Sequence, residues 1–257
     1  MTVTQDLDVT AASPSATLDR LSLVLDAFDG RDSLSLAEVV LRTGLPRSSA
    51  HRMLDRLVAL RWLRREGRSY SLGIRLVELG SLAVHQDKVH SAAMEHLHQL
   101  YRTTGMVVHL AVLDGDDVVY LEKIGGRFAA HVPTRVGGRR PAHTSALGAA
   151  LLAFNGTTGA RYDHIRDHGY AIERNGALRG FGCIAAPIGP IGEATTAVSI
   201  CGPLRHMAFD SRMTSPVLLT AQAAWRSMSE GVRVTPTLAR RNMLRRMPTA
   251  PSVLAEG

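Results

Sequence analysis

Arginine side chains are concentrated in one part of this 257-residue chain, between residues 42 and 75. A guanidinium group carries a planar fork of N–H donors, which matches phosphate oxygens and the acceptor edge of guanine. Only Asp55 and Glu66 oppose this charge within the stretch, whereas an ordinary solvated face mixes both signs. The stretch holds nine arginines: Arg42, Arg47, Arg52, Arg56, Arg61, Arg64, Arg65, Arg68 and Arg75. With the formal net charge of +7, they predict a polyanionic partner.

The segment TGLPRSSAHRML, residues 43–54, combines a turn signal with a polar and basic start. Gly44 suits the residue that ends one helix, and Pro46 suits the first turn of the next. Apolar residues then recur at the spacing of one helical face, which predicts a buried stripe. The stripe consists of Ala50, Met53, Leu54, Leu57 and Val58. The opposite face is left with arginine and serine, which can reach bases and phosphates.

The neighbouring segments complete a domain that could hold this helix against DNA. Helical spacing of apolar residues predicts a helix over 17–28, and Ser35 with Glu38 forms a capping box at the start of a second helix. The segment LRREGRSYSLG alternates around a Glu-Gly turn and predicts a two-stranded hairpin. Three helices followed by a basic hairpin predict a winged helix-turn-helix over residues 17–73, with the third helix in the major groove.

We expect the third helix to contact bases and phosphates, and the hairpin to hold the DNA backbone or the minor groove. A good bidentate contact from Arg47 or Arg52 to guanine would contribute about 1–3 kcal/mol of discrimination. A basic face that only aids solubility is the alternative interpretation. The residues expected to contact DNA are Arg47, Ser48, Ser49, His51, Arg52 and Arg56 of the helix, with Arg64, Arg65, Arg68 and Tyr70 of the hairpin.

A region of mixed character follows the winged helix-turn-helix. Residues 74–86 predict a helix that is apolar nearly all round, which suits a linker helix buried against a partner. Strands are expected at residues 106–113, 117–124, 183–188 and 194–202, and helices at residues 91–104, 142–154, 161–168 and 214–228. Strands mixed with helices after an all-helical start predict a separate α/β domain over residues 87–230, and an α+β fold class for the chain.

Several separated stretches resemble, in order, those of the IclR family of bacterial transcriptional regulators, over about residues 18–229. They are TGLPRSSAHRML and YSLGIRLVELG in the first half, and GGRRPAHTSALGAALLA, HGYAI, GCIAAPI and AVSICGP in the second. The resemblance implies a curved antiparallel sheet flanked by helices. It also implies a homodimer or homotetramer formed through the winged helices and linker, and a small organic effector, often a carboxylate, in the concave pocket of the sheet.

An anionic effector could bind near the start of the helix at residues 142–154. Gly137 and Gly138 permit close approach of the backbone, and free amides at a helix start favour negative charge. The resemblance places two cysteines and a serine along the pocket wall, where Ser199 and Cys201 share one face of a strand. Effector contacts are expected from Gly137, Gly138, Arg139, His143, Thr144, Ser145, Glu173, Cys183, Ser199 and Cys201.

Each of these effector assignments has a plain structural alternative. Thr144 or Ser145 could be an ordinary helix N-cap. Both cysteines could be small buried packing residues. Arg139 and its neighbour Arg140 could pair with an effector carboxylate or simply carry surface charge.

The chain departs from the family pattern at four places around the expected pocket. The segment before HGYAI is shorter, and the acidic pair usual after GYA is replaced by Asn175-Gly176, which leaves Glu173 nearby. Cys201 stands where the family usually has a serine, and Ala149 where it often has a lysine. These departures motivate a second interpretation, in which the protein is a constitutive regulator that has lost its effector response.

The sequence offers little for metal or catalytic chemistry. His164 and His168 could share one helix face, but no third ligand stands at a suitable spacing, so no metal site is expected. His143 and Cys183 could act as base and nucleophile, but no orienting third residue is evident. We therefore expect neither an enzyme activity nor a cofactor.

The two ends of the chain differ from the rest. Residues 1–16 are polar without the apolar run of a signal peptide, and we expect a disordered leader. Residues 231–257 contain LARRNMLRRM, a basic extension that could contact DNA, pack on a partner subunit or remain free. No apolar run approaches the length of a membrane span, and the two cysteines form no C-x-x-C motif. We expect a cytoplasmic protein without a membrane partner.

These patterns predict a sequence-specific, DNA-binding transcriptional regulator that forms a dimer or tetramer. Its affinity for a double-stranded operator would change when a small organic effector binds. A further alternative is a ligand-binding or enzymatic domain whose winged helix contacts protein. The arginine cluster of one sign argues against it, because a protein interface should bury fewer unpaired charges.

Overall fold

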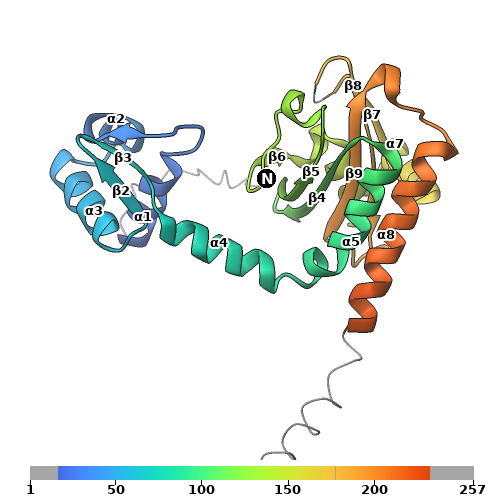
Figure 1. Ribbon diagram of the computed structural model, residues 1–257, viewed down its shortest axis with the longest axis horizontal. Helices are drawn as coiled ribbons and strands as arrows, with labels where there is room; N and C mark the ends of the chain where they lie inside the picture. Colours follow the sequence, from blue (N-terminus) through green and yellow to red (C-terminus); the bar gives the residue numbers. More distant parts are fainter. Residues whose placement is uncertain (1–16, 177, 232–257) are drawn as a thin grey trace, which may run out of the picture. The chain divides into compact units, whose positions relative to one another are not determined.

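The computed structural model describes residues 17–176 and 178–231, which form two compact units divided between Ala83 and Val84 (Figure 1). The expected leader, residues 1–16, lies outside the described residues. So does the expected C-terminal extension apart from its first residue, Gly231.

The first unit is a winged helix-turn-helix, as predicted. Its elements are α1 (Thr17–Asp26), β1 (Leu34–Ser35), α2 (Leu36–Thr43), α3 (Arg47–Ala59), β2 (Leu63–Glu66) and β3 (Ser69–Leu72). The strands form an antiparallel sheet in the order β1-β3-β2, so the hairpin gains a third, two-residue strand that the sequence pattern does not predict. Its core contains Val24, Phe28, Val39, Leu54 and Leu63, each almost fully buried.

The turn between α2 and α3 has the chemistry expected from the sequence. Ser35 Oγ accepts a hydrogen bond from the Glu38 amide, and Glu38 Oε2 accepts one from the Ser35 amide, at 3.3 and 2.7 Å. These bonds hold the pKa of Glu38 below its usual value. Gly44 ends α2 with φ of 68°, a left-handed conformation that costs little only for glycine. The chain then reverses at once into α3.

Helix α4 (Ile74–Gln86) begins directly after the wing and is tied to it. The Gly73 amide donates to the Trp62 carbonyl at 2.7 Å, and a Cβ on Gly73 would collide with the carbonyl of Arg61. No residue of α4 is buried, and three of its large apolar side chains are more than half exposed: Ile74, Val77 and Leu82. The predicted helix is therefore present, with an apolar surface that this chain does not cover within the described residues.

The second unit is built on a six-stranded antiparallel sheet, in the order β6-β5-β4-β9-β8-β7. Its strands are β4 (Val107–Asp114), β5 (Asp117–Ile124), β6 (Arg139–Pro141), β7 (Ala171–Arg174), β8 (Phe181–Ile188) and β9 (Thr196–Pro203). The sequence pattern predicts the four long central strands. It misses β6 and β7, which are short strands at the two edges.

Helices cover both faces of this sheet, as the predicted fold class requires. They are α5 (Lys88–Thr104), α6 (Ala146–Phe154), α7 (Ala160–His168) and α8 (Ser211–Gly231), with three short 3-10 turns at Ala129–His131, Ala142–Thr144 and Leu204–His206. Because side chains alternate along a strand, Ile184 and Ile200 pack in the core with α5 and α8, whereas Ala185 and Ala197 pack with α6. Figure 1 shows α5 and α8 side by side.

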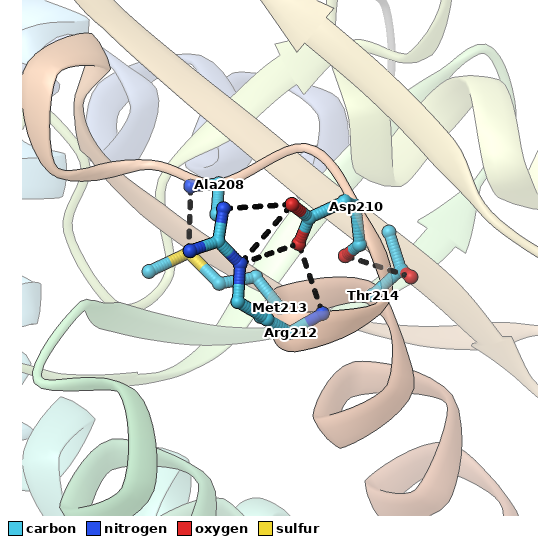
Figure 2. Close-up of polar contacts among 5 residues, drawn as sticks. All are labelled: Ala208, Asp210, Arg212, Met213 and Thr214. Atoms are coloured by element: carbon cyan, nitrogen blue, oxygen red, sulfur yellow. Dashed lines mark hydrogen bonds and ion pairs between the residues drawn. The ribbon is translucent and has the colours of Figure 1, made fainter.

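The start of α8 is fixed by a local polar cluster (Figure 2). The Asp210 carbonyl accepts hydrogen bonds from the amide and hydroxyl of Thr214, at 2.9 and 3.1 Å. Its carboxylate accepts the Arg212 amide at 3.0 Å and pairs with the Arg212 guanidinium at 2.8 Å. These bonds lower the pKa of Asp210 and satisfy donors that a helix start otherwise leaves open.

Candidate nucleic-acid interface and effector cavity

The outer face of α3 carries the residues expected to contact DNA. Arg47, Ser48, His51, Arg52 and Arg56 are exposed, and Ser49 is half-buried. Their orientation follows from the opposite face, where Ala50, Leu54 and Leu57 are buried in the core of the winged unit. Four of the exposed residues line one open groove together with a side chain of α2 that the sequence did not single out: Arg47, Ser48, His51, Arg52 and Leu36.

The first turn of α3 offers backbone donors in addition to side chains. Pro46 is the N-cap residue and makes no side-chain capping bond, unlike Ser35 at the start of α2. Amides in a helix start point outward and favour an anion such as a phosphate. The arrangement can therefore accept a DNA backbone at the same point where Arg47 and Ser48 face outward.

A chain of charged groups links α3 to the wing. His51 Nδ1 lies 3.2 Å from Asp55 Oδ2, and Asp55 Oδ1 lies 3.9 Å from Arg65 Nη1. All three side chains are about half exposed, so these ion pairs add little stability. The Arg65 guanidinium beside the Asp55 carboxylate lowers the repulsion between that carboxylate and a phosphate.

The wing orients its arginines to different degrees. Arg64 Nε donates to Ser71 Oγ at 2.7 Å, and its guanidinium lies 3.2 Å from the Glu66 carboxylate. Arg65 Nε donates to the Gly67 carbonyl at 3.0 Å. Arg68 is exposed beside the turn. All three arginines remain at the surface, where they can reach a phosphate.

The prediction that Tyr70 contacts DNA is wrong. Tyr70 is only 2% exposed and belongs to the core of the winged unit. Its neighbours in the strand are more exposed, since alternate residues of β3 face opposite sides. Arg65 lies over its ring, with the guanidinium carbon 5.5 Å from the centroid. Tyr70 therefore supports an arginine that is itself available to DNA.

The second unit contains a small cavity against the sheet face that α6 covers. Its free volume is about 30 Å³, enough for roughly two water molecules. Five of the ten residues predicted to contact an effector lie on its wall: Ser145, Glu173, Cys183, Ser199 and Cys201. Ser145 is also the N-cap of α6, with Oγ accepting the Gly148 amide at 3.0 Å.

The other five residues predicted to contact an effector do not line this cavity: Gly137, Gly138, Arg139, His143 and Thr144. Arg139 instead pairs with Asp114 at 2.7 Å and Asp117 at 3.2 Å on the outer side of the hairpin. Its neighbour Arg140 lines the cavity, because adjacent residues of a strand face opposite sides. Since His143 is exposed outside the cavity, Cys183 and His143 do not share its wall.

Thr144 and the glycine pair hold the cavity wall in place instead. Arg140 Nε donates to Thr144 Oγ1 at 3.3 Å, and that hydroxyl donates to the Pro141 carbonyl at 2.7 Å. The Gly137 amide and the Gly138 carbonyl bond to the backbone of Tyr120, at 2.8 and 3.0 Å. These residues position Arg140 and Tyr120, both of which face the cavity.

Three polar residues of the cavity wall were not predicted from the sequence: His109, Tyr120 and Thr134. Arg140, which the sequence offered as a possible partner of an effector carboxylate, also lines the cavity. His109 is 3% exposed, and its Nε2 lies 2.8 Å from Thr134 Oγ1. Burial, with the charge of Lys123 nearby, lowers the pKa of His109 to about 3, and burial raises the pKa of Tyr120 to about 12. The available signal was a single histidine within the otherwise apolar strand MVVHLAVL.

Lys123 anchors the segment that passes over His109. Its Nζ donates to the carbonyls of Val132 and Thr134, both at 2.7 Å. Loss of hydration lowers the pKa of this ammonium group. Because Val132, Pro133 and Thr134 all line the cavity, these bonds and the His109–Thr134 contact fix one of its walls.

The comparisons with known proteins place both units in one family. Residues 17–67 match the IclR helix-turn-helix domain, and residues 81–162 match the C-terminal domain of bacterial IclR transcriptional regulators. The transcriptional regulator XynR of Escherichia coli is 30% identical over 199 residues, which cover 66% of this chain and 79% of that protein. The chain belongs to the IclR family. It is a transcriptional regulator of the IclR type.

Other members of the family agree with this fold. KdgR of Dickeya chrysanthemi is 28% identical over 236 residues, 80% of this chain and 77% of that protein. The crystal structure of an IclR homologue from Microbacterium hydrocarbonoxydans, complexed with 4-hydroxybenzoate, superposes with a TM-score of 0.73 at 25% identity and covers 84% of this chain and all of that one. The IclR structure from Thermotoga maritima, at 22% identity and a TM-score of 0.64, shows the same fold.

Two absences hold within residues 17–176 and 178–231. No helix among them is long and apolar enough to cross a membrane. Within the same residues, no three histidine, cysteine, aspartate or glutamate side chains gather where they could hold a metal ion. His164 and His168 stack on each other instead, with ring centroids 3.9 Å apart.

Proposed function

We propose that this IclR-type regulator binds a two-fold symmetric, double-stranded operator through α3, with one half-site per subunit, and responds to a small organic effector. The exposed basic face of α3 carries the proposal. Buried residues on its other side hold that face in one orientation. The operator contacts would come from the α3 residues and from Arg64, Arg65 and Arg68. Because its target is the bacterial chromosome, the protein would act in the cytoplasm.

A homodimer or homotetramer would bring two copies of α3 to one operator. The apolar side chains of α4 support this assembly, because Ile74, Val77 and Leu82 are 57%, 60% and 51% exposed in the single chain. Large apolar side chains that are exposed together on one helix can mark a protein interface. The winged unit adds Leu18 and Leu72, which are 75% and 48% exposed.

The effector we propose is a small organic acid bound in the cavity of the second unit. Arg140 would pair with its carboxylate, in the bidentate geometry that a guanidinium favours. His109 and Tyr120 would offer neutral hydrogen-bonding groups, as their shifted pKa values require. The 4-hydroxybenzoate bound to the Microbacterium homologue supports an organic acid as the ligand class. Ligand binding would favour one of two arrangements of the dimer and so change operator affinity.

A constitutive regulator is the second candidate, because the cavity is small. A free volume of about 30 Å³ is below that of ordinary ligand pockets, which span roughly 300–1,000 Å³. An effector would have to displace wall residues, whereas a protein without an effector needs no such space. Neither candidate assigns a catalytic step to the chain.

The test is selection of genomic fragments by the purified full-length protein, followed by footprinting with and without small organic acids. We expect a protected site with two-fold symmetry, and at least one acid that changes the protection. A symmetric footprint that no acid alters would favour the constitutive regulator. Binding without sequence preference at every salt concentration would contradict operator recognition.

A further inference from the structure

The only two cysteines of the chain lie opposite each other in the cavity wall. Cys183 on β8 and Cys201 on β9 are paired directly across the antiparallel ladder. Both line the cavity, so both side chains are on the same face of the sheet. They are free thiols, and Cys201 is only 4% exposed. Two thiols therefore face one small space from neighbouring strands.

The pairing of β8 with β9 determines the distance between the two cysteine side chains. Directly opposed residues of an antiparallel pair have Cβ atoms about 4.5–5.5 Å apart. At this spacing the two thiol groups are near enough to interact. A single atom placed between them can bond to both sulfurs. Strand pairing holds this arrangement, and no change of backbone is needed to form it.

The surroundings keep the Cys183 thiol uncharged. The hydrogen bond with Cys201, burial, and the carboxylate of Glu173 raise the pKa of Cys183 well above its ordinary value. Arg140 opposes this shift but does not reverse it. Nearby, His109 stays neutral and Tyr120 stays protonated. Oxidation by peroxide, which requires a thiolate, is therefore disfavoured. A ligand that reacts with neutral thiols and leaves a neutral product suits this environment.

We propose that Cys183 and Cys201 form a paired-thiol site for a small, neutral oxyacid of a trivalent thiophilic element, of which arsenite, As(OH)₃, is the probe. Two As–O bonds are replaced by two As–S bonds. Each thiol proton leaves with one hydroxide as water, and the third hydroxyl stays on arsenic. No electrons are transferred, so no oxidant is needed. The bound As–OH group is small, which agrees with a cavity of about 30 Å³.

This site does not depend on the proposed operator binding, although it shares the proposed effector cavity. An organic acid would meet Arg140, whereas the arsenic atom would bond to the two sulfurs. The two ligands would therefore compete for one space through different residues. The chain contains no other cysteine, so any thiol-dependent binding must involve this pair.

The first experiment is titration of the reduced full-length protein with arsenite, followed by native mass spectrometry and equilibrium dialysis. We expect one arsenic per chain, with a mass gain equal to As(OH)₃ minus two waters. Arsenate at the same concentration, a pentavalent oxyanion, should not bind. Cys183→Ser and Cys201→Ser should each weaken binding at least tenfold, because a single sulfur cannot chelate.

The cysteine variants need a check on folding, since Cys201 is buried. Cys183→Ala and Cys201→Ala provide a second pair, and thermal unfolding shows which of the four variants are folded. Folded single-cysteine variants that bind arsenite as tightly as the natural chain would overturn the paired-thiol site. Absence of arsenic binding by the natural chain would overturn it as well.

Operator binding measured without arsenite separates the two proposals. Arsenic binding by a protein that recognises no operator would support the thiol site and contradict the proposed function. A protein that recognises its operator but binds no arsenite would overturn the thiol site and leave the proposed function standing.

Discussion

The α3 surface and the cavity of the second unit hold their polar groups in opposite ways. On α3 the arginines and serines extend into solvent, and apolar residues on the far side of the helix fix their direction. At the cavity, hydrogen bonds hold polar side chains of the wall, as in the His109–Thr134 and Arg140–Thr144 contacts. One surface is oriented by packing and the other by hydrogen bonds.

This difference agrees with the sizes of the two proposed ligands, DNA and a small organic acid. DNA presents regularly spaced phosphates and base edges, so flexible charged side chains on a rigid helix can reach it. A small molecule must replace every hydrogen bond that it breaks in a buried site, because an unsatisfied buried group is costly. We expect mutations of the exposed α3 residues to change affinity while leaving stability alone, and mutations in the cavity to change both.

The largest effect should come from the residue that orients α3. Leu54 is fully buried, and Leu54→Ala should lower the free energy of unfolding of the winged unit by about 2–5 kcal/mol. Leu41→Ala is the matched control, since Leu41 is 85% exposed. The free energies of unfolding of both variants are measured by urea denaturation, with hydrogen exchange of the α3 amides as the local probe. Equal losses in the two variants would contradict the assignment of the core.

Arg52→Ala should give the next largest effect, on affinity rather than stability. Loss of a bidentate contact to guanine should weaken operator binding by about 1–3 kcal/mol and relax the base preference at one position. Arg52→Lys keeps the positive charge but loses the bidentate donors of the guanidinium group. It should therefore relax the base preference with a smaller loss of operator affinity than Arg52→Ala. Arg102→Ala, on α5, is the control. Titration of operator variants measures all three; unchanged binding by Arg52→Ala would remove Arg52 from the interface.

Much of the fold could be predicted from the sequence because its signals are local. The capping box at Ser35, the turn at Gly44 and the apolar stripe around Leu54 each depend on residues a few positions apart. The long strands likewise show continuous apolar runs. The short strands β1, β6 and β7 could not be predicted, because two to four residues carry too little pattern and exist only through pairing with a distant strand.

The two candidate sites were predictable to different extents for the same reason. The α3 surface belongs to one helix, so its spacing alone placed most of the residues, and only Tyr70 in the wing was misplaced. The cavity gathers residues from all six strands of its sheet and from α6. Only the register of β6 shows that Arg140, and not Arg139, faces the cavity. Only the pairing of His109 with Ser199 on β9 shows that His109 lies in the cavity wall.

His109 should give the cavity a dependence of stability on pH. Unfolded His109 takes up a proton near pH 6.5, whereas in the folded chain it does so only near pH 3, so the unfolded state binds more protons between these values. The free energy of unfolding should therefore fall as the pH drops from 6.5 toward 3, with His109 contributing up to about 1.4 kcal/mol per pH unit. His109→Gln should flatten this profile, while His143→Gln, at an exposed position, should keep it. Parallel profiles for the natural chain and His109→Gln would show that His109 is not buried in its neutral form.

The smallest effect should come from the wing, where Arg68 is exposed at the tip. A phosphate contact carries no sequence information, so Arg68→Ala should weaken binding to operator and to unrelated DNA by the same factor. The slope of log K against log salt should become shallower by about 0.9 for one lost phosphate. Arg205→Ala, an exposed arginine of the second unit, should leave that slope unchanged. If Arg68→Ala instead changes base preference, the wing reads sequence, and recognition by this regulator extends beyond α3.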